Sequence, residues 1–330
     1  MYNLIIEESE VNFFITKIYG KLLNMKNYDN TFNKILEEVK KHQEKKDYKK
    51  FKKIDIHEHI TSEPDFDKFL EVMDEFNIEK VLLMPSGGEG REREELVLKI
   101  QEKYPDKYVA FAFLKEVGKR AEKHLKNSIK AGAKGLKLLL WHPNIYSNNK
   151  LPMDSAEVWR IFEICSESKI PILAHMSIRS YPEHSEQLEN TLKKFPQQIF
   201  IIPHYLGAAP RLDDIVSPLL DKYPNLYTDV SMGGGKNRYV SYIQGFRKTF
   251  RQFFKKYHNR LFWGTDLFIG PKSSKNTRFY HNRIKHDINL FDEKFFYSPF
   301  HEENTFLRGL NLSDKILNDV FYNNARRLLK

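Results

Sequence analysis

The chain has 330 residues, 41% hydrophobic and 14% aromatic, so it can bury one large core or two small ones. No run approaches the ~18 apolar residues that a membrane span needs, and no early basic cluster suggests a signal peptide. The formal net charge of +10 favours anionic partners. The single cysteine, Cys165, excludes a disulfide framework within one chain. It predicts a cytoplasmic protein in which this thiol packs in the core.

Residues 1–50 differ in composition from the rest of the chain. They contain no proline and one glycine, Gly20, and their apolar residues recur at helical spacing, as in Phe14, Ile18 and Leu22. We predict a helical N-terminal extension that packs on the main domain or on a partner chain.

From residue 51 onward, short apolar runs alternate with helical patterns. Several runs are apolar throughout, as expected of strands buried on both faces. Alternation of strand and helix implies parallel βαβ units. Eight such units between residues 51 and 330 predict a (β/α)8 TIM barrel, and a doubly wound open sheet is the main alternative. The candidate strands are 51–57, 80–84, 108–113, 133–140, 170–175, 199–204, 225–231 and 260–266.

Two later segments stand out by composition. Residues 267–303 are polar, aromatic and basic, and they follow the last predicted strand, where a lid or an oligomer contact would fit. Residues 236–285 hold thirteen Lys and Arg against one acid, Asp266. We interpret this charge first as a solvated face, next as attraction for an acidic substrate, and last as a nucleic-acid site.

The first predicted strand ends in a histidine pair. Asp55, His57 and His59 are spaced two residues apart, and residues at that spacing in a strand point to the same face, about 6.6 Å apart. Two imidazoles so placed can bind one metal ion with bonds of about 2.1 Å. Taken alone, however, a His-x-His pair is a weak signal.

The ends of other predicted strands carry further polar groups. Lys137 lies in the fourth strand, and His175, His204 and Asp266 end the fifth, sixth and eighth. Each alone could be structural: a satisfied histidine, a helix cap or a salt-bridged lysine. Active sites of (β/α)8 barrels lie at the carboxyl ends of the strands, so these groups would meet. Three imidazoles and a carboxylate would suit zinc and similar divalent ions.

This order of residues resembles the amidohydrolase superfamily. The local text is similar to the amidohydrolase-related group that includes aminocarboxymuconate-semialdehyde decarboxylase and several lactone and amide hydrolases. The resemblance spans roughly residues 51–330, and neither the extension at 1–50 nor the insertion at 267–303 belongs to the usual pattern. The matching stretches are IDIHEHI, AGAKGLKL, IPILAHM, PHYLGAAPRL, YPNLYTDVS, LFWGTDLF and YNNARRLL.

The resemblance implies roles for these residues. His57, His59 and His175 would bind the metal, and Asp266 would be a ligand and take a proton from the metal's water. His204 would be an acid/base or polarising group. Lys137 stands where two-metal relatives carry a carboxylated lysine that bridges the ions. We favour one Zn²⁺, with other divalent ions and a second metal left open.

The implied activity is hydrolysis of an ester, lactone or amide of a small, anionic substrate. Non-oxidative decarboxylation at the same metal is the alternative, and a nucleic-acid-processing protein or a non-catalytic scaffold are rivals of other classes. We expect Asp55 to support the site from behind the ligands. Candidate substrate-binding residues in the loops after the strands are His142, Arg179, Arg211 and Arg238.

Overall fold

The strands form two parallel sheets in the computed structural model, which describes residues 29–62, 66–85, 90–231, 238–269, 273–298 and 305–329. All strand pairs in these two sheets are parallel. One sheet has the order β10 (Leu267–Ile269), β1 (Lys53–Ile60), β2 (Ile78–Pro85) and β3 (Tyr108–Ala110). The other runs β4 (Ala112–Leu114), β5 (Leu136–Trp141), β6 (Ile172–Met176), β7 (Phe200–Ile201), β8 (Leu226–Asp229) and β9 (Leu261–Phe262).

The two sheets meet at both edges. Between β3 and β4 only Phe111 intervenes, and its backbone N–H still donates to Leu83 on β2. At the other edge, the N–H of Ile56 on β1 donates to the carbonyl of Trp263, just after β9, over 3.2 Å. Neighbouring strands otherwise follow one another in chain order, as expected of consecutive βα units. The predicted α/β class is confirmed, and these edge contacts are of the kind that closes a barrel.

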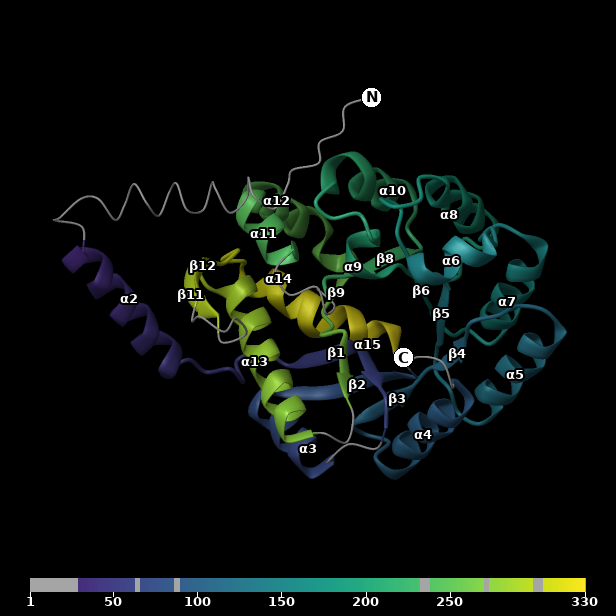
Figure 1. Cartoon of the computed structure of the whole chain (residues 1–330), viewed down its shortest axis with the longest axis horizontal. Coiled ribbons are helices and arrows are strands. Elements are labelled where there is room, and N and C mark those ends of the chain that lie inside the picture. The colour runs from purple at the N-terminus through teal and green to yellow at the C-terminus, as the bar shows by residue number, and fades with distance from the viewer. Residues whose placement is uncertain are drawn as a thin grey trace.

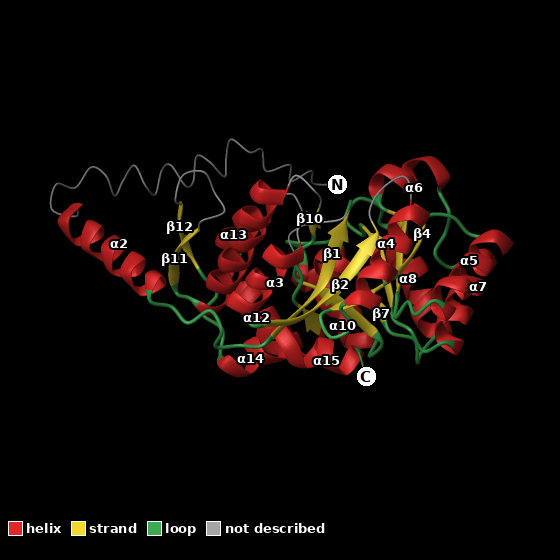
Figure 2. Cartoon of the chain, turned by 90° about the horizontal axis from the view of Figure 1, so that it is seen from below, coloured by secondary structure: helices red, strands yellow, loops and turns green. Residues whose placement is uncertain are grey.

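Helices surround the strands on the outside (Figures 1 and 2). They are amphipathic for this reason: in α5, for example, Ala121 and Leu125 are buried, whereas its lysines face water. These helices are α3 (Phe66–Glu75), α4 (Gly90–Lys103), α5 (Lys119–Lys130), α6 (Pro143–Asn149), α7 (Ala156–Glu167), α8 (Glu183–Lys194), α10 (Ser217–Lys222), α11 (Arg238–Gly245), α12 (Arg247–Tyr257), α13 (Ser273–Asp292), α14 (Asp314–Asn318) and α15 (Asn324–Leu328).

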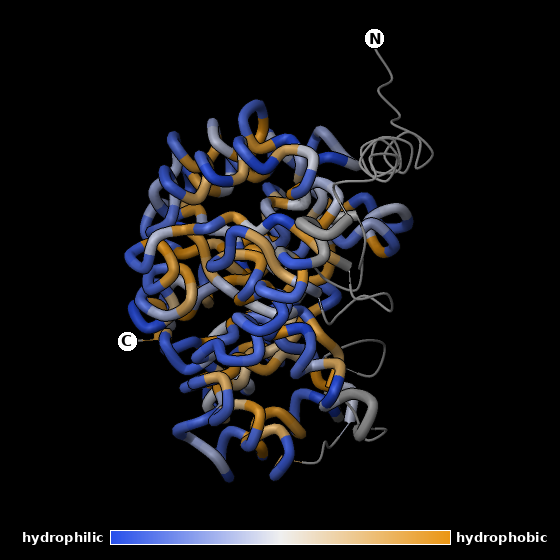
Figure 3. Tube along the Cα trace, turned by 90° about the vertical axis from the view of Figure 1, so that its left-hand side faces the viewer, coloured by the Kyte–Doolittle hydropathy of each residue, from blue (hydrophilic) through white to orange (hydrophobic). Residues whose placement is uncertain are grey.

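Two clusters of buried apolar side chains follow from this layering. The larger lies between strands and helices, and it includes Cys165, which is fully buried as predicted. The smaller takes its members from strands of both sheets, among them Ile54 and Phe262, and therefore fills the space between the sheets. Along the trace, hydrophobic residues concentrate inside and hydrophilic ones outside (Figure 3).

The N-terminal extension and the insertion contact each other. Helix α2 (Asp29–Glu44) extends to one side of the body (Figure 1). Its Gln43 exchanges two hydrogen bonds with the backbone of Tyr297 on β11 (Phe295–Ser298). Strand β11 pairs antiparallel with β12 (Thr305–Arg308), whose Arg308 backbone is bonded in the same way by Gln244 of α11. Glutamine amides thus cover both edges of this ribbon.

Parts of the predicted extension and insertion lie outside the described residues, namely 1–28 and 299–304. The division into a helical extension and a barrel domain stays a prediction, as does a lid role for 267–303. In the described parts of the chain, no helix combines the length and the apolar character needed to cross a bilayer.

Candidate metal centre

A β-bulge on β1 contains His57, the first residue of the histidine pair. The three steps from Asp55 to Glu58 on β1 match only two steps, from Val81 to Leu83, on β2. The extra residue of a bulge changes the face that the following side chains take. The bulge lies where the chain after β9 runs alongside β1 and bonds to it.

The bulge corrects one prediction. Ile54 and Ile56 belong to the cluster between the sheets, whereas Ile60 belongs to the outer core, although strict alternation would place all three together. Asp55 correspondingly bonds to Thr265 and to Tyr280 of α13. The prediction that Asp55 shares a face with the two histidines is therefore wrong, because the sequence does not reveal the bulge.

Asp266 is brought to the histidine pair by an unusual backbone. Its φ is 51°, and its N–H donates to the carbonyl of His57 over 2.6 Å. Gly264 allows this approach, since a Cβ there would lie 2.8 Å from the Cβ of His57. The result is a triangle in which Nε2 of His57, Nε2 of His59 and Oδ1 of Asp266 are each 3.2 Å from the other two.

His204 lies in a left-handed turn after β7. His204, Tyr205 and Leu206 all have φ between 54° and 59°, a conformation that is strained for residues other than glycine. Glycine is required next, because a Cβ at Gly207 would lie 2.4 Å from the carbonyl oxygen of Met176. The turn directs Nε2 of His204 toward Oδ2 of Asp266, at 3.5 Å.

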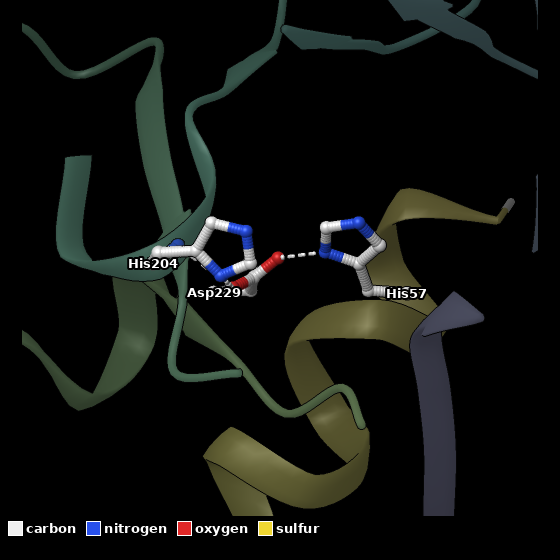
Figure 4. A group of neighbouring side chains, drawn as sticks. All are labelled: His57, His204 and Asp229. Atoms are coloured by element: carbon white, nitrogen blue, oxygen red, sulfur yellow. Dashed lines mark hydrogen bonds and ion pairs between the residues drawn. The ribbon is translucent and has the colours of Figure 1, made fainter. Parts of the chain in front are cut away.

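Asp229, at the end of β8, connects His57 and His204, and it was not among the predicted site residues (Figure 4). Its Oδ2 lies 2.7 Å from Nδ1 of His57. Its Oδ1 accepts the backbone N–H of His204 at 3.0 Å and the hydroxyl of Ser231 at 2.6 Å. Although burial raises the pKa of Asp229, the contacts with His57 and His204 hold it below its usual range.

These contacts assign the protons on two imidazoles. Ionised Asp229 can only accept, so Nδ1 of His57 carries a proton and its Nε2 keeps a lone pair. The Ser231 hydroxyl donates to Asp229 and therefore accepts from Nδ1 of His204, at 2.9 Å. The lone pair on Nε2 of His57 thus faces the triangle.

Burial favours the neutral form of three histidines of the site, His57, His59 and His175. It lowers the pKa of His57, and the nearby charge of Lys137 lowers it further. Burial likewise lowers the pKa of His59 to about 4, in spite of the contact with Asp266. The pKa of His175 falls well below its usual value through burial and its neighbour His204. Neutral imidazoles are the form that binds metal ions.

Lys137 lies inside the same group of residues. It is fully buried on β5, and its Nζ is 2.8 Å from Nε2 of His57. Burial lowers the pKa of this ammonium to about 8, although Asp266 and Asp229 act in the opposite direction. In this arrangement Lys137 donates a proton to the lone pair of His57 that faces the triangle.

His175 and His142 complete the surroundings. The ring centre of His175 is 5.0 Å from that of His204 and 4.6 Å from that of His142. Nδ1 of His142 accepts the backbone N–H of Asn144 and caps α6, so in the neutral ring Nε2 carries the proton. His142 is half-buried beside the site.

Two of the three arginines predicted to bind the substrate have described side chains, and each is bonded to another residue. Arg179 donates to Tyr242 of α11 at 2.8 Å. Arg211 pairs with Asp214 on the surface. The side chain of Arg238 lies outside the described residues. Of the three candidate substrate-binding residues whose side chains the structure describes, His142 is the one that contacts the histidine cluster.

Behind the triangle, two buried carboxyl groups share one hydroxyl. Oγ1 of Thr265 lies 2.7 Å from Asp55 and closer still to Glu58. A hydroxyl donates only one proton, so one carboxyl group must itself be protonated. Asp55 accepts the N–H groups of His57 and Thr265, whereas Oε1 of Glu58 has no partner in the described structure. Glu58 therefore holds the proton, and burial and Asp55 raise its pKa well above the usual value.

The proton on Glu58 makes the free energy of unfolding depend on pH. The folded protein keeps Glu58 protonated, while the unfolded chain releases that proton above pH ~4.5, so stability declines as pH rises beyond this value. Glu58→Gln copies the protonated form. We expect its free energy of unfolding to gain on the wild type by up to about 1.4 kcal/mol per pH unit above 4.5.

Urea unfolding at pH 4 to 8 measures this gain. Glu95→Gln, on the exposed part of α4, is the matched control and should leave the pH dependence unchanged. An equal effect of Glu58→Gln at every pH would show that Glu58 is ionised in the folded protein.

The donor set fits a divalent ion. In a tetrahedral site with bonds of about 2.05 Å, ligand atoms lie about 3.3 Å apart, close to the three 3.2 Å sides of the triangle. His57, His59 and Asp266 form one group that could hold a metal, and His57, His204 and Asp229 form another. In the second group, however, Asp229 meets the protonated Nδ1 of His57, so we favour the first.

Comparison with known proteins agrees with this geometry. A sequence profile described as amidohydrolase matches residues 59–330. The chain belongs to the amidohydrolase family. The match covers most of the parallel sheets and begins at His59, so His57 lies just outside it. Among curated proteins, none matches the sequence.

Two solved structures have a similar fold. One is 4-oxalomesaconate hydratase from Rhodopseudomonas palustris, with a TM-score of 0.54, 15% identity, and coverage of 84% of this chain and 95% of the hydratase. The other is an apo protein from Agrobacterium tumefaciens, with a TM-score of 0.52, 12% identity, and coverage of 84% and 96%. At these identities the likeness concerns the fold alone.

Proposed function

We propose that this amidohydrolase is a metal-dependent hydrolase with a closed (β/α)8 barrel and one divalent ion, Zn²⁺ by preference. His57, His59, His175 and Asp266 would hold the ion. The observation that carries the proposal is the triangle of ligand atoms at 3.2 Å, built from two neutral imidazoles and a carboxylate. A divalent ion there supplies Lewis acidity and lowers the pKa of water from 15.7 toward ~7.

In this proposal, Asp266 and His204 carry out different proton transfers. Asp266 is ionised, because the contacts with His57, His204 and His59 hold its pKa well below the usual value despite burial. It accepts the proton of the attacking water. His204 has its Nδ1 proton directed to Ser231, so Nε2 is the atom that takes this proton from Oδ2 of Asp266, 3.5 Å away, and donates it to the carbonyl oxygen or the leaving group.

The substrate we propose is a small, anionic ester, lactone or amide. Buried Lys137 attracts negative charge, and Nε2–H of His142 offers a fixed donor beside the cluster. The alternatives at the same site are non-oxidative decarboxylation and, by analogy with the hydratase of similar fold, addition of water to a double bond. A panel of lactones, acyl amides, aromatic carboxylates and unsaturated acids separates these three reactions.

The proposed function is tested by elemental analysis of the purified protein. We expect about one divalent ion per chain in the wild type and almost none in His57→Ala/His59→Ala. His42→Ala, on the exposed side of α2, is the control and should keep the ion. Equally low metal in the wild type and the double variant would contradict the proposal.

A variant of Lys137 tests whether the site holds one metal ion or two. If the site holds one ion, the ammonium of Lys137 competes for the lone pair of His57 and repels the ion. Lys137→Met should then keep about one equivalent of metal and bind it at least as tightly as the wild type. Metal titration followed by elemental analysis measures this, and a fall from two equivalents to one would instead identify Lys137 as a bridge.

Two further features belong to the proposal. A cytoplasmic location rests on the single buried thiol of Cys165, and an oligomer would use helix α2 or the insertion.

The alternative function, binding of nucleic acid, rests on the basic stretch 236–285. It predicts binding to DNA or RNA that falls steeply with salt, and absence of binding at low salt would remove it.

A further inference from the structure

The histidines around the triangle differ in the hydrogen-bond partner of their Nδ1 atom. Nδ1 of His57 is fixed by the carboxylate of Asp229, and Nδ1 of His204 by the hydroxyl of Ser231. Nδ1 of His59 is buried and has no hydrogen-bond partner within the described structure. Metal-binding histidines usually donate this second N–H to an acceptor that fixes the ring, so His59 lacks the usual support.

Instead, the ring of Phe268 lies against His59. The two residues are register partners on β10 and β1, and their ring centres are 4.9 Å apart with planes inclined by 15°. Leu267 and Ile269, on the other face of β10, are buried in the outer core. Phe268 therefore points toward the site and covers one face of the imidazole.

Packing in the core does not explain Phe268. Its side chain is 56% exposed, and among the described residues only it and Phe246 are large hydrophobic side chains with such exposure. The part of the ring that is not exposed includes the face stacked on His59. Here that buried face rests on the ring of His59, whose Nδ1 has no hydrogen-bond partner among the described residues.

We propose that Phe268 is a positioning residue that fixes the ring of His59 by stacking, in place of the missing hydrogen bond. The inference rests on the proposed function, because it concerns the state in which Nε2 of His59 binds the ion. In that state Nδ1 must carry the proton, and no acceptor for it lies among the residues that the structure describes. A flat ring packed on the imidazole restricts its rotation and keeps Nε2 turned toward His57 and Asp266.

The test is the affinity for Co²⁺, measured by competition with a chromophoric chelator and by the visible absorption of the bound ion. Loss of an outer partner of a metal ligand typically weakens binding 10- to 100-fold, and we expect about 10-fold for Phe268→Ala and Phe268→Leu. Leucine keeps apolar bulk but not the flat ring. Phe268→Tyr keeps the ring and should bind within twofold of the wild type.

Phe246→Ala is the matched control, because Phe246 is the other exposed phenylalanine and lies between α11 and α12. It should bind Co²⁺ like the wild type. Wild-type affinity in Phe268→Leu, or equal losses in Phe268→Tyr and Phe268→Ala, would overturn the inference and leave the proposed function intact. A wild type that binds no Co²⁺ would overturn both.

Discussion

Replacing Asp229 with asparagine is expected to weaken metal binding by about 10- to 100-fold while the protein stays folded. The oxygen of the amide can still accept from His204 N–H and from Ser231. Its NH2 group would face Nδ1 of His57, where Oδ2 of Asp229 now lies at 2.7 Å. Nδ1 would then have to accept, the ring proton would move to Nε2, and the lone pair directed at the triangle would be lost.

Zn²⁺ affinity by chelator competition and a thermal melt check this expectation together. Asp213→Asn, on an exposed part of the turn before α10, controls for the loss of one negative charge. A variant that folds and binds Zn²⁺ within twofold of the wild type would show that Asp229 does not set the tautomer of His57.

Asp266→Asn is expected to keep the ion and to lower kcat by roughly 10²- to 10⁴-fold, the usual contribution of a positioned base. Asparagine suits this position, because Asp266 has a φ of 51° and asparagine accepts left-handed backbone readily. Its oxygen can still face the two histidines, whereas its amide cannot take a proton from water.

The measurement is kcat on the ester, lactone or amide that the wild type hydrolyses fastest, with metal content determined on the same sample. Asp106→Asn, exposed in the turn before β3, serves as control. Unchanged turnover in Asp266→Asn would remove Asp266 as the base, and loss of the ion would leave it as a ligand only.

Much of the site could be predicted because it depends on local patterns. A strand places its last side chains at one edge of a sheet, and parallel strands share that edge. His57, His59, His204 and Asp266 were predicted to meet on this basis, and the structure brings them together. Their roles as ligand, acid and base stay proposals.

Asp229 was missed although its signal was present. It lies near the end of a candidate strand, 225–231, as the other predicted site residues do in theirs. A lone aspartate in a strand more often satisfies backbone donors, and Asp229 does so with His204. Its second contact, with His57, joins strands 172 residues apart in the chain, and no local pattern reveals such a pair.

The prediction that arginines bind the substrate stays a proposal, and it rests on a weaker basis. Their position after strand ends was the sole ground for selecting them, and a flexible side chain in a loop has several partners within reach. Arg211 finds Asp214 three residues along the chain, and Arg179 finds Tyr242 on α11. His142, another candidate, differs from these arginines because its side chain caps α6, and this contact fixes the ring.

The sequence by itself determined the α/β class, the family resemblance and the kind of chemistry, because strand periodicity and residue type are local properties. The tertiary structure decided which way the side chains point and which protons they carry. The bulge that separates Asp55 from the histidines depends on the register of β1 with β2, and the tautomer of His57 depends on Asp229. Both arise from contacts between strands, so they exist only once the sheets have formed.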